Sequence, residues 1–332
     1  MVLHIGRSDK MLAVAFHPDG KHVLGGNDDG IRRWRLADGQ EVGKQTGMRL
    51  LAISVSRDDK WIVCGTHEKG ASVWDREIQE KILNVEDENV VDAVDFSPDS
   101  MRFATGTRPK EASIWSITTG QRLVGPLEHE SRVMGLRFSP NGERIATACF
   151  QGIRIFDTHT GDKLVTINTD IRGWAETTPL AWSNDGQQIF AVSRSNKIRA
   201  LDASTGTRLV ESRILDYSYT IHGIALAANS KFITTCAGHS VLFLDTSTLG
   251  QIGPVIDDGE ETWSVALSPD SSHLAAGRPD AKIVIRDLGK ILPVSYGPFN
   301  VSVCALILLA CRISPVSSLT LTKYVSIYSR RR

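Results

Sequence analysis

Side chains capable of chemistry are scattered along this sequence rather than gathered into a motif. The five cysteines are Cys64, Cys149, Cys236, Cys304 and Cys311. None of them belongs to a C-x-x-C pair or another metal-ligand spacing, and the nine histidines follow no metal-binding pattern. No phosphate-binding G-x-x-x-x-G-K-S/T, zinc-binding H-E-x-x-H or nucleophile-bearing G-x-S-x-G segment occurs. We therefore predict no catalytic residue, no metal site and no cofactor, and the chain is not expected to be an enzyme.

Two short acidic runs are the remaining candidates for a cation site, because carboxylates are the usual ligands of hard cations. They read EDE at residues 86–88 and DDGEE at residues 257–261. The sequence repeat described below places them on loops of different structural units, where acidic side chains are usually solvated. We predict that neither run binds a metal ion.

Charge and composition limit the classes of partner. Lys plus Arg number 38 and Asp plus Glu number 38, so the formal charge is zero. Proteins that bind phosphate backbones usually carry a basic excess, which this sequence lacks. Hydrophobic residues make up 41% and charged residues 23%, as in ordinary globular proteins. The odd number of cysteines and the lack of an apolar N-terminal stretch predict a reducing compartment, the cytoplasm or the nucleus.

A turn-like segment similar to FSPDG returns seven times at a nearly constant interval. Successive copies begin 39, 41, 42, 44, 44 and 41 residues apart, and a second landmark follows each after 18 or 19 residues. The copies begin at Phe16, Val55, Phe96, Phe138, Trp182, Leu226 and Leu267, and the second landmarks are Trp34, Trp74, Trp115, Phe156, Leu201, Leu244 and Arg286. Trp115 is therefore one of seven structural equivalents and not part of a unique site.

Each repeat has the pattern of short β-strands joined by tight turns. In IRIFD, residues 153–157, the side chains alternate between two faces, as strand geometry requires. Small residues recur in the middle strands, as in VCG at 63–65 and ATG at 104–106, and allow neighbouring sheets to approach closely. Cys64, Cys149 and Cys236 occupy these positions, so we predict buried thiols. Four antiparallel strands in each of seven units predict an all-β, seven-bladed β-propeller.

The order V..V.FSPDG, then LATG, then IRIWD..TG resembles the repeat of the WD40 β-propeller family over about residues 2–296. The turns WSITTG at Trp115 and FDTHTG at Phe156 carry much of this resemblance, and the degenerate repeats are similar to those of fungal multidomain proteins. The resemblance implies a non-enzymatic scaffold that binds protein or peptide partners through loops on a face of the propeller. We predict a propeller over residues 1–296 and a C-terminal extension over 297–332.

The repeats depart from the family pattern in their polar residues. Trp-Asp occurs once, at Trp74-Asp75, and no repeat has the family's full set of loop His, strand Ser or Thr, turn Asp and strand Trp. The fourth repeat has His129 and Thr147, but Phe156 cannot donate an indole N–H. We interpret His129 as a remnant of a lost network and predict that apolar packing stabilises the blades.

The two ends of the repeat region leave alternatives open. Residues 2–5 (VLHI) and residues 290–296 (KILPVSY) both fit the outer strand that would close the last blade. The apolar run 301–313 is too short to span a bilayer, which needs roughly 20 residues, so a membrane anchor is disfavoured. Residues 297–332 are then an extension or partial extra strand, or the altered end of a longer repeat protein.

Longer loops on two neighbouring units indicate where a partner binds. The spacing between landmarks grows after the fourth and fifth repeats, and the added segments bring aromatic residues that favour interfaces. We predict contacts at Arg172, Trp174, Tyr217 and Tyr219; the alternative for Trp174, which the sequence supports equally, is that it folds back to cover the adjoining blade. Turns of the third and seventh repeats add Arg108, Lys110, Arg278 and Lys282, which with Glu68, Glu111 and Asp280 would form a mixed-charge rim.

These residues favour a protein or peptide partner of unspecified identity, bound by a monomeric propeller or by one that belongs to a larger complex. A chromatin or RNA reader is the alternative, and a propeller enzyme that uses the central channel is a weaker one. Fold alone does not name the partner.

Overall fold

The computed structural model divides the chain into two compact units, Met1–Gly297 and Pro298–Arg332. It describes residues 1–4, 11–27, 30–43, 47–77, 80–169, 171, 180–193, 195–213, 221–257 and 259–297, all of them in the first unit. The expectations for the C-terminal extension therefore lie outside the described residues. Within the described ranges, no helix is long and apolar enough to cross a membrane.

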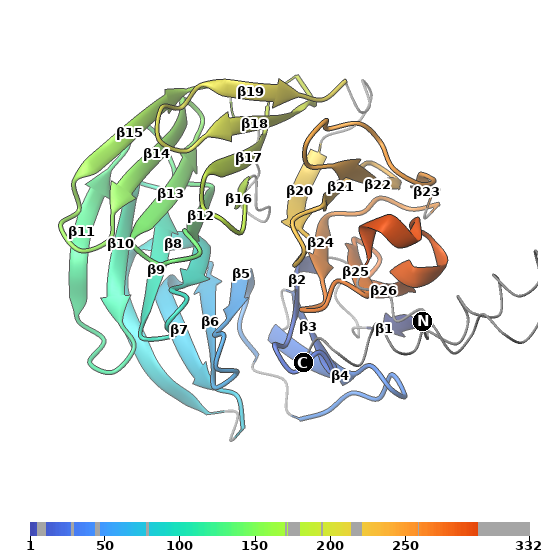
Figure 1. Ribbon diagram of the computed structural model, residues 1–332. Coiled ribbons are helices and arrows are strands. Elements are labelled where there is room, and N and C mark those ends of the chain that lie inside the picture. The colour runs from blue at the N-terminus through green and yellow to red at the C-terminus, as the bar shows by residue number, and fades with distance from the viewer. Residues whose placement is uncertain are drawn as a thin grey trace, which may run out of the picture. The chain divides into compact units, whose positions relative to one another are not determined.

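Seven antiparallel blades surround a central axis, as predicted (Figure 1). Blades 1 to 3 contain β2 (Met11–Phe16), β3 (His22–Asn27), β4 (Gly30–Arg35), β5 (Leu50–Val55), β6 (Trp61–Thr66), β7 (Lys69–Asp75), β8 (Lys81–Phe96), β9 (Arg102–Thr107), β10 (Glu111–Ser116) and β11 (Arg122–Glu128). Blades 4 and 5 contain β12 (Gly135–Phe138), β13 (Arg144–Cys149), β14 (Gly152–Asp157), β15 (Lys163–Asn168), β16 (Leu180–Trp182), β17 (Gln188–Val192), β18 (Ile198–Asp202) and β19 (Arg208–Glu211). Blades 6 and 7 contain β20 (Ile221–Leu226), β21 (Phe232–Ala237), β22 (Ser240–Asp245), β23 (Ile256–Asp257), β24 (Ser264–Leu267), β25 (His273–Arg278) and β26 (Lys282–Asp287).

Two features depart from a ring of separate four-stranded blades. Strand β8 is continuous over 16 residues and serves both as the outer strand of blade 2 and as the inner strand of blade 3, which joins these blades into one seven-stranded sheet. Blade 1 has three strands among the described residues, and its outer position is marked by a single bridge between Trp34 and Glu41. The fourth strand of blade 1 is thus reduced to a bridge among the described residues.

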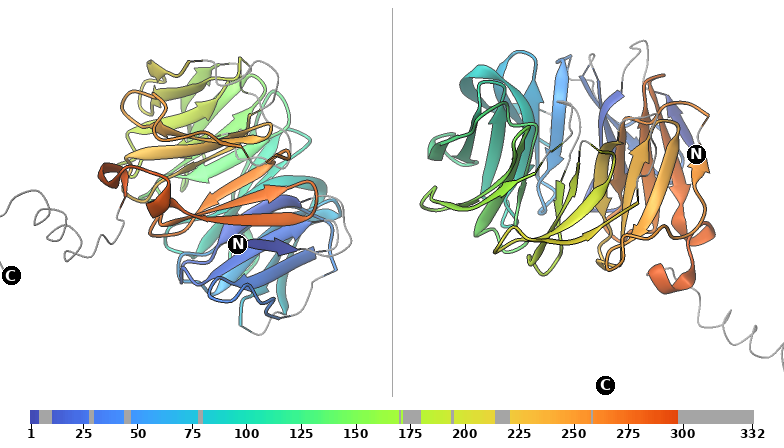
Figure 2. Two further views of the ribbon diagram at one scale, coloured as in Figure 1. Left: turned by 90° about the vertical axis from the view of Figure 1, so that its right-hand side faces the viewer. Right: turned by 90° about the horizontal axis from the view of Figure 1, so that it is seen from above.

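The N-terminal strand closes the ring. Strand β1 (Val2–His4) pairs antiparallel with β26, with Leu3 opposite Ile283, and lies beside blade 7 in Figure 2. The Met1 amino group donates to the Ile285 carbonyl at 2.9 Å, and the Ile285 N–H donates to the Met1 carbonyl at 2.8 Å. Of the two candidates for this position, residues 2–5 therefore supply the strand.

The other candidate segment folds differently, because its place in blade 7 is taken. Two short 3-10 turns, η1 (Leu288–Lys290) and η2 (Val294–Tyr296), lead it to the turns of blade 6. The Tyr296 hydroxyl donates to Asp245 Oδ2 at 3.0 Å, and Lys231 Nζ donates to the Ser295 carbonyl at 2.8 Å. The segment after blade 7 thus braces the neighbouring blade.

The hydrophobic core lies between adjacent blades and not inside single ones. One cluster joins Val63 and Val73 of blade 2 to Phe96, Phe103 and Trp115 of blade 3. Trp115 is 5% exposed, and its Nε1–H donates to Thr105 Oγ1 at 2.9 Å, so it is a core residue as predicted. Each inner strand also contacts the next one around the whole ring. Because every interface is shared, each blade depends on both of its neighbours.

The small residues of the middle strands are required by this close approach. A Cβ added to Gly65 would lie 2.5 Å from the Val91 carbonyl oxygen of blade 3, and one added to Gly106 would lie 2.7 Å from Val133 Cγ1. Cys64, Cys149 and Cys236 are free and fully buried, and burial raises the pKa of the Cys64 thiol. The prediction of buried small side chains at these positions is confirmed.

We expect Gly65→Ala to destabilise the protein by about 1–3 kcal/mol, the usual cost of overpacking. Its backbone conformation suits alanine, so the cost arises from the clash with a backbone oxygen and not from strain at Gly65 itself. Gly250→Ala is the matched control, since its nearest neighbour would be Thr248 Oγ1 at 3.3 Å in an exposed turn. Urea unfolding measures both changes, and equal stabilities would contradict the packing account.

Candidate functional site

Four of the predicted contact residues, Arg172, Trp174, Tyr217 and Tyr219, lie outside the described residues and remain predictions. The other four belong to turns between middle strands. Because such turns and the connections between blades leave from one side of the ring, we call that side the upper face; the lower face carries the turns within the inner and outer strand pairs.

The structure does not bring the other four predicted cations together. Arg108 and Lys110 lie in the β9–β10 turn of blade 3, whereas Arg278 and Lys282 flank the turn of blade 7, and these blades are not neighbours. Arg278 and Lys282 both pair with Asp280, at 3.2 and 2.5 Å. Asp280 thus offsets one of their two positive charges within their own blade.

Arg108 belongs to a cluster that sequence reasoning missed. Its Nε lies 3.2 and 3.3 Å from the two carboxylate oxygens of Asp92, and Arg132 Nη2 lies 3.0 Å from Asp92 Oδ2. The Asp92 side chain is 0% exposed. Burial raises its pKa, and the charges of Arg132 and Arg108 oppose that rise. A signal was present, because the aligned position holds Leu12, Leu51 and Met134 in other repeats.

The connection between blades 3 and 4 that carries Arg132 is held firmly. The His129 N–H donates to the Lys110 carbonyl at 2.8 Å, and the Val133 N–H donates to the Thr107 carbonyl at 3.0 Å. These bonds tie both ends of the connection to the turn that carries Arg108. The two arginines therefore keep a fixed spacing relative to each other.

His129 is more than the remnant we expected from the sequence. It is 7% exposed, its Nδ1–H donates to the Leu127 carbonyl at 2.8 Å, and its Nε2 lies 2.7 Å from Thr147 Oγ1. Burial lowers its pKa, which keeps the ring neutral. Phe156 contacts the ring edge-on, with 5.5 Å between centroids, so the network ends at the residue that lacks an N–H, as predicted.

An exposed aromatic residue lies next to this connection. Phe150, in the β13–β14 turn, is 36% exposed, and its backbone N–H donates to Ser131 Oγ at 3.2 Å. Glu130 is paired with the buried Arg154 at 2.8 Å, and this hydrogen bond lowers the pKa of Glu130. We call Asp92, Arg108, Glu130, Arg132 and Phe150 the upper cluster. It presents cations and an aromatic ring on a hydrogen-bonded frame.

The central channel offers little chemistry among its described lining residues. It has a volume of about 440 Å³ and is lined on one side by alanines such as Ala15, Ala181 and Ala225. The other side carries Asp95, which accepts the Phe138 N–H at 2.9 Å and lies 3.4 Å from Arg137 Nη1. The described lining residues include no histidine or cysteine, and no group of described acids, histidines or cysteines could hold a metal ion.

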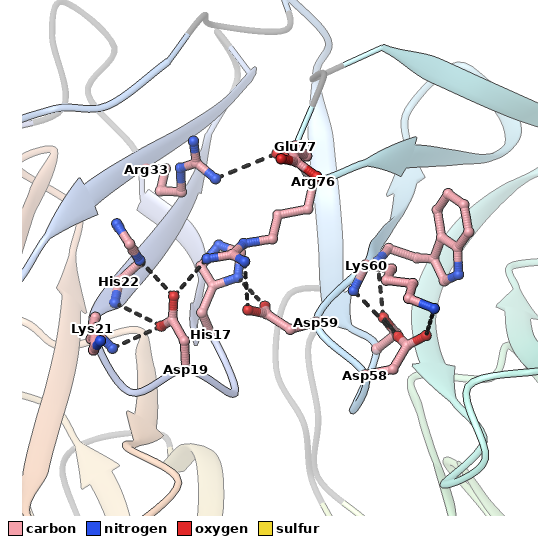
Figure 3. Close-up of polar contacts among 12 residues, drawn as sticks. His17, Asp19, Lys21, His22, Arg33, Asp58, Asp59, Lys60, Arg76 and Glu77 are labelled. Atoms are coloured by element: carbon pink, nitrogen blue, oxygen red, sulfur yellow. Dashed lines mark hydrogen bonds and ion pairs between the residues drawn. The ribbon is translucent and has the colours of Figure 1, made fainter.

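A second charged region lies on the lower face between blades 1 and 2 (Figure 3). Arg76 of blade 2 reaches across the joint to Asp19 at 2.5 Å and pairs within its own blade with Asp59 at 2.7 Å. His17 Nδ1 lies 2.8 Å from Asp59, and His22 Nδ1 lies 2.7 Å from Asp19. A polar cavity of about 600 Å³, lined by Arg33 and Lys60 among others, adjoins this network.

Between other blades, the same position carries an uncharged hydrogen bond from a backbone N–H to a serine hydroxyl in place of this network. There, Ser100 Oγ accepts the Asp58 N–H at 3.2 Å and Ser271 Oγ accepts the Ala228 N–H at 2.8 Å. Asp59 occupies the position of these serines, and His17 occupies that of the first turn residue, which is serine in five other repeats. We therefore assign this region to the joining of two blades rather than to ligand binding.

We expect His17 to make folding sensitive to pH. Burial lowers the pKa of His17 despite its hydrogen bond to Asp59, so the unfolded chain binds more protons below about pH 6.5. Stability should therefore fall as the pH drops from 7 to 5, with a contribution of up to about 1.4 kcal/mol per pH unit from one histidine. His129, whose pKa is also lowered, acts in the same direction.

His17→Ser should reduce this slope, since serine at this position can bond the turn acid as Ser97 bonds Asp99 at 2.5 Å. His159→Ser, at a side chain that is 67% exposed, is the control. Urea unfolding at pH 7 and pH 5.5 gives the slopes. If the unfolding free energy of His17→Ser depends on pH as steeply as that of the wild type, His17 is not the source of the pH sensitivity.

Comparisons with known proteins agree with this fold. The family "WD domain, G-beta repeat" matches residues 2–35 and 121–157. A crystal structure of the Myceliophteria thermophila Cps50 (Swd1) beta-propeller domain superimposes with a TM-score of 0.74 at 15% identity, covering 86% of this chain and 99% of that one. At this identity the likeness shows the fold alone.

Three similar sequences carry different names. Intraflagellar transport protein 122 homolog of Xenopus tropicalis is 18% identical over 83% of this chain and 23% of its own length. Small ribosomal subunit protein RACK1 of Schizosaccharomyces pombe is 34% identical over 33% of this chain and 36% of its own. Eukaryotic translation initiation factor 3 subunit I of Candida albicans is 22% identical over 76% of this chain and 83% of its own length. This chain thus spans 23% to 36% of the length of the first two.

The seven repeats, the closed ring and these likenesses lead to one assignment. Residues 2–35 and 121–157 match WD40 repeats, and the described chain folds as a seven-bladed β-propeller.

Proposed function

We propose that this chain is a non-enzymatic interaction platform, and that its upper cluster on blades 3 and 4 holds a protein or peptide partner. The observation that carries the proposal is Phe150, which is 36% exposed on a turn whose backbone is bonded to Ser131. An aromatic ring held in place loses little entropy on binding, and aromatic residues and arginines dominate the energies of interfaces.

The predicted aromatics belong, in sequence, to connections between blades. Trp174 belongs to the connection between blades 4 and 5, and such connections leave from the upper side. Residues 172–179 and 214–220 lie outside the described residues, so their part in the interface stays a prediction. In this proposal they extend the surface that begins at Phe150.

Charge favours a protein partner over a nucleic acid. The formal charge is zero, and Glu130 lies within the upper cluster next to its cations. Proteins that bind phosphate backbones usually carry a basic excess, which this sequence lacks. The channel, in turn, shows no paired acid, base and nucleophile among its described residues that would support catalysis.

The similar proteins are named as a ribosomal subunit protein, a translation initiation factor subunit and an intraflagellar transport protein. Two of these names describe subunits of larger assemblies. We extend this to the present chain as a proposal: it acts inside the cell, in the cytoplasm or nucleus, as part of a complex.

Phe150→Ser should remove a defined partner from the proteins captured with the full chain in cells. Truncating an interface hot spot costs about 2 kcal/mol or more, which corresponds to roughly a thirtyfold loss of affinity. Met101→Ser is the matched control, because Met101 is a 61% exposed apolar residue in a lower-face turn.

Quantitative mass spectrometry compares the wild type with both variants, and thermal unfolding confirms that they are folded. The proposal predicts a partner that is retained by the wild type and by Met101→Ser and depleted with Phe150→Ser. Identical partner sets for all three would contradict it. Capture that disappears steeply with added salt would instead favour a nucleic acid.

A further inference from the structure

The upper cluster presents two arginines to solvent, whereas the carboxylate that pairs with both of them, Asp92, is buried. Asp92 is 0% exposed, whereas the side chains of Arg108 and Arg132 are 41% and 27% exposed. Two guanidinium groups share this one carboxylate, so the three residues together carry one excess positive charge. Because an incoming anion comes closer to the exposed guanidinium groups than to the buried carboxylate, the cluster attracts anions.

Part of the hydrogen-bonding capacity of these arginines is unused. Arg108 contacts Asp92 through Nε. Arg132 Nε and Nη2 are buried, with Nη2 3.0 Å from Asp92 Oδ2, so the donors that remain for an incoming group are Arg108 Nη1 and Nη2 and Arg132 Nη1. A guanidinium offers five N–H donors in a planar fork that matches a carboxylate or a phosphate. The cluster therefore has both the charge and the donors to hold such a group.

An equivalent arginine in blade 7 belongs to a group of the same net charge whose exposure is different. Arg278 also precedes a proline in the turn between middle strands, but its side chain is only 13% exposed. Its acid, Asp280, is 30% exposed and also pairs with Lys282 at 2.5 Å. There the carboxylate faces solvent and the arginine is covered, which is the reverse of the arrangement in blade 3.

The surroundings of the two arginines indicate a peptide. Glu130, the nearby acid on the same connection, is already paired with Arg154 at 2.8 Å. Phe150, which is exposed, is bonded through its backbone to Ser131, next to Arg132 in the chain. Arg132 thus lies on a connection that is bonded to the turn carrying the exposed aromatic ring. An extended peptide with an acidic residue followed by an apolar residue would satisfy both.

We propose that Arg108 and Arg132 bind an anionic side chain of the partner, a carboxylate or a phosphate on an extended peptide, while Phe150 packs against a neighbouring apolar residue. This inference rests on the proposed function and specifies the chemistry of the partner. The carboxylate and the phosphate share the same recognition, and the probes below distinguish them.

Fluorescence polarisation with the full chain tests this directly. The first probe is a labelled peptide with the core Glu-Glu-Leu-Glu-Glu-Leu. The second has glutamine in place of every glutamate. The third has phosphoserine in place of the second glutamate, the one that precedes the first leucine. We expect the glutamate probe to bind at least tenfold more tightly than the glutamine probe. The phosphoserine probe will bind more tightly than the glutamate probe if phosphate is the preferred anion, and no more tightly if carboxylate is.

Variants locate the binding. Arg108→Gln and Arg132→Gln should each weaken binding of the glutamate probe at least tenfold, and Arg278→Gln should leave it unchanged. Asp92→Asn should strengthen binding by about fivefold, because it removes the competing carboxylate and keeps both arginines. A misfolded protein would not produce this gain, so the test holds even if an arginine variant is unstable.

Equal binding of the glutamate and glutamine probes, or no gain with Asp92→Asn, would overturn the inference. So would a ten-nucleotide single strand that binds more tightly than either acidic peptide. If the probes behave as expected but Phe150→Ser loses no cellular partner, the anion site stands and the proposed function fails. If a partner is lost but the probes do not bind, the function stands and its acidic chemistry is wrong.

Discussion

The backbone pairing of β1 with β26 is the interaction on which the rest of the structure depends. Each hydrophobic cluster is shared by two adjacent blades, so an unclosed ring would leave two blade faces exposed to water. Strand β1 completes blade 7 and places Leu3, 3% exposed, into the core at the seam between blades 7 and 1. Four residues from the start of the chain therefore hold together elements almost 300 residues apart.

A closed ring holds the turns of the upper face in fixed positions. Short turns that are already fixed lose little conformational entropy when a partner binds, so they can form an interface. The connection that carries Arg132 is bonded to the β9–β10 turn on one side and to β13 on the other. His129, buried and neutral, supports this connection from below. The polar residues that survive in the fourth repeat thus position the candidate site, while the apolar residues of the other repeats hold the blades.

The sequence allowed the blades to be predicted because they arise from local patterns that repeat. The turn FSPDG, the alternation in IRIFD and the small residues at 63–65 each report a local requirement, and the structure meets all three. The upper cluster was not predictable in the same way. Asp92, Arg108 and Arg132 come from three separate segments, and only the approach of two blades brings them together. The choice between residues 2–5 and 290–296 likewise depended on which segment could reach the edge of β26.

Removal of Met1–His4 tests the closure of the ring most directly. The account predicts that the shortened chain unfolds at least about 5 °C lower, because a buried leucine and a strand are lost. Hydrogen exchange should then speed up in blades on both sides of the seam and beyond, since each blade relies on its neighbours. An unchanged midpoint, or faster exchange confined to β26, would show that the ring does not depend on this strand.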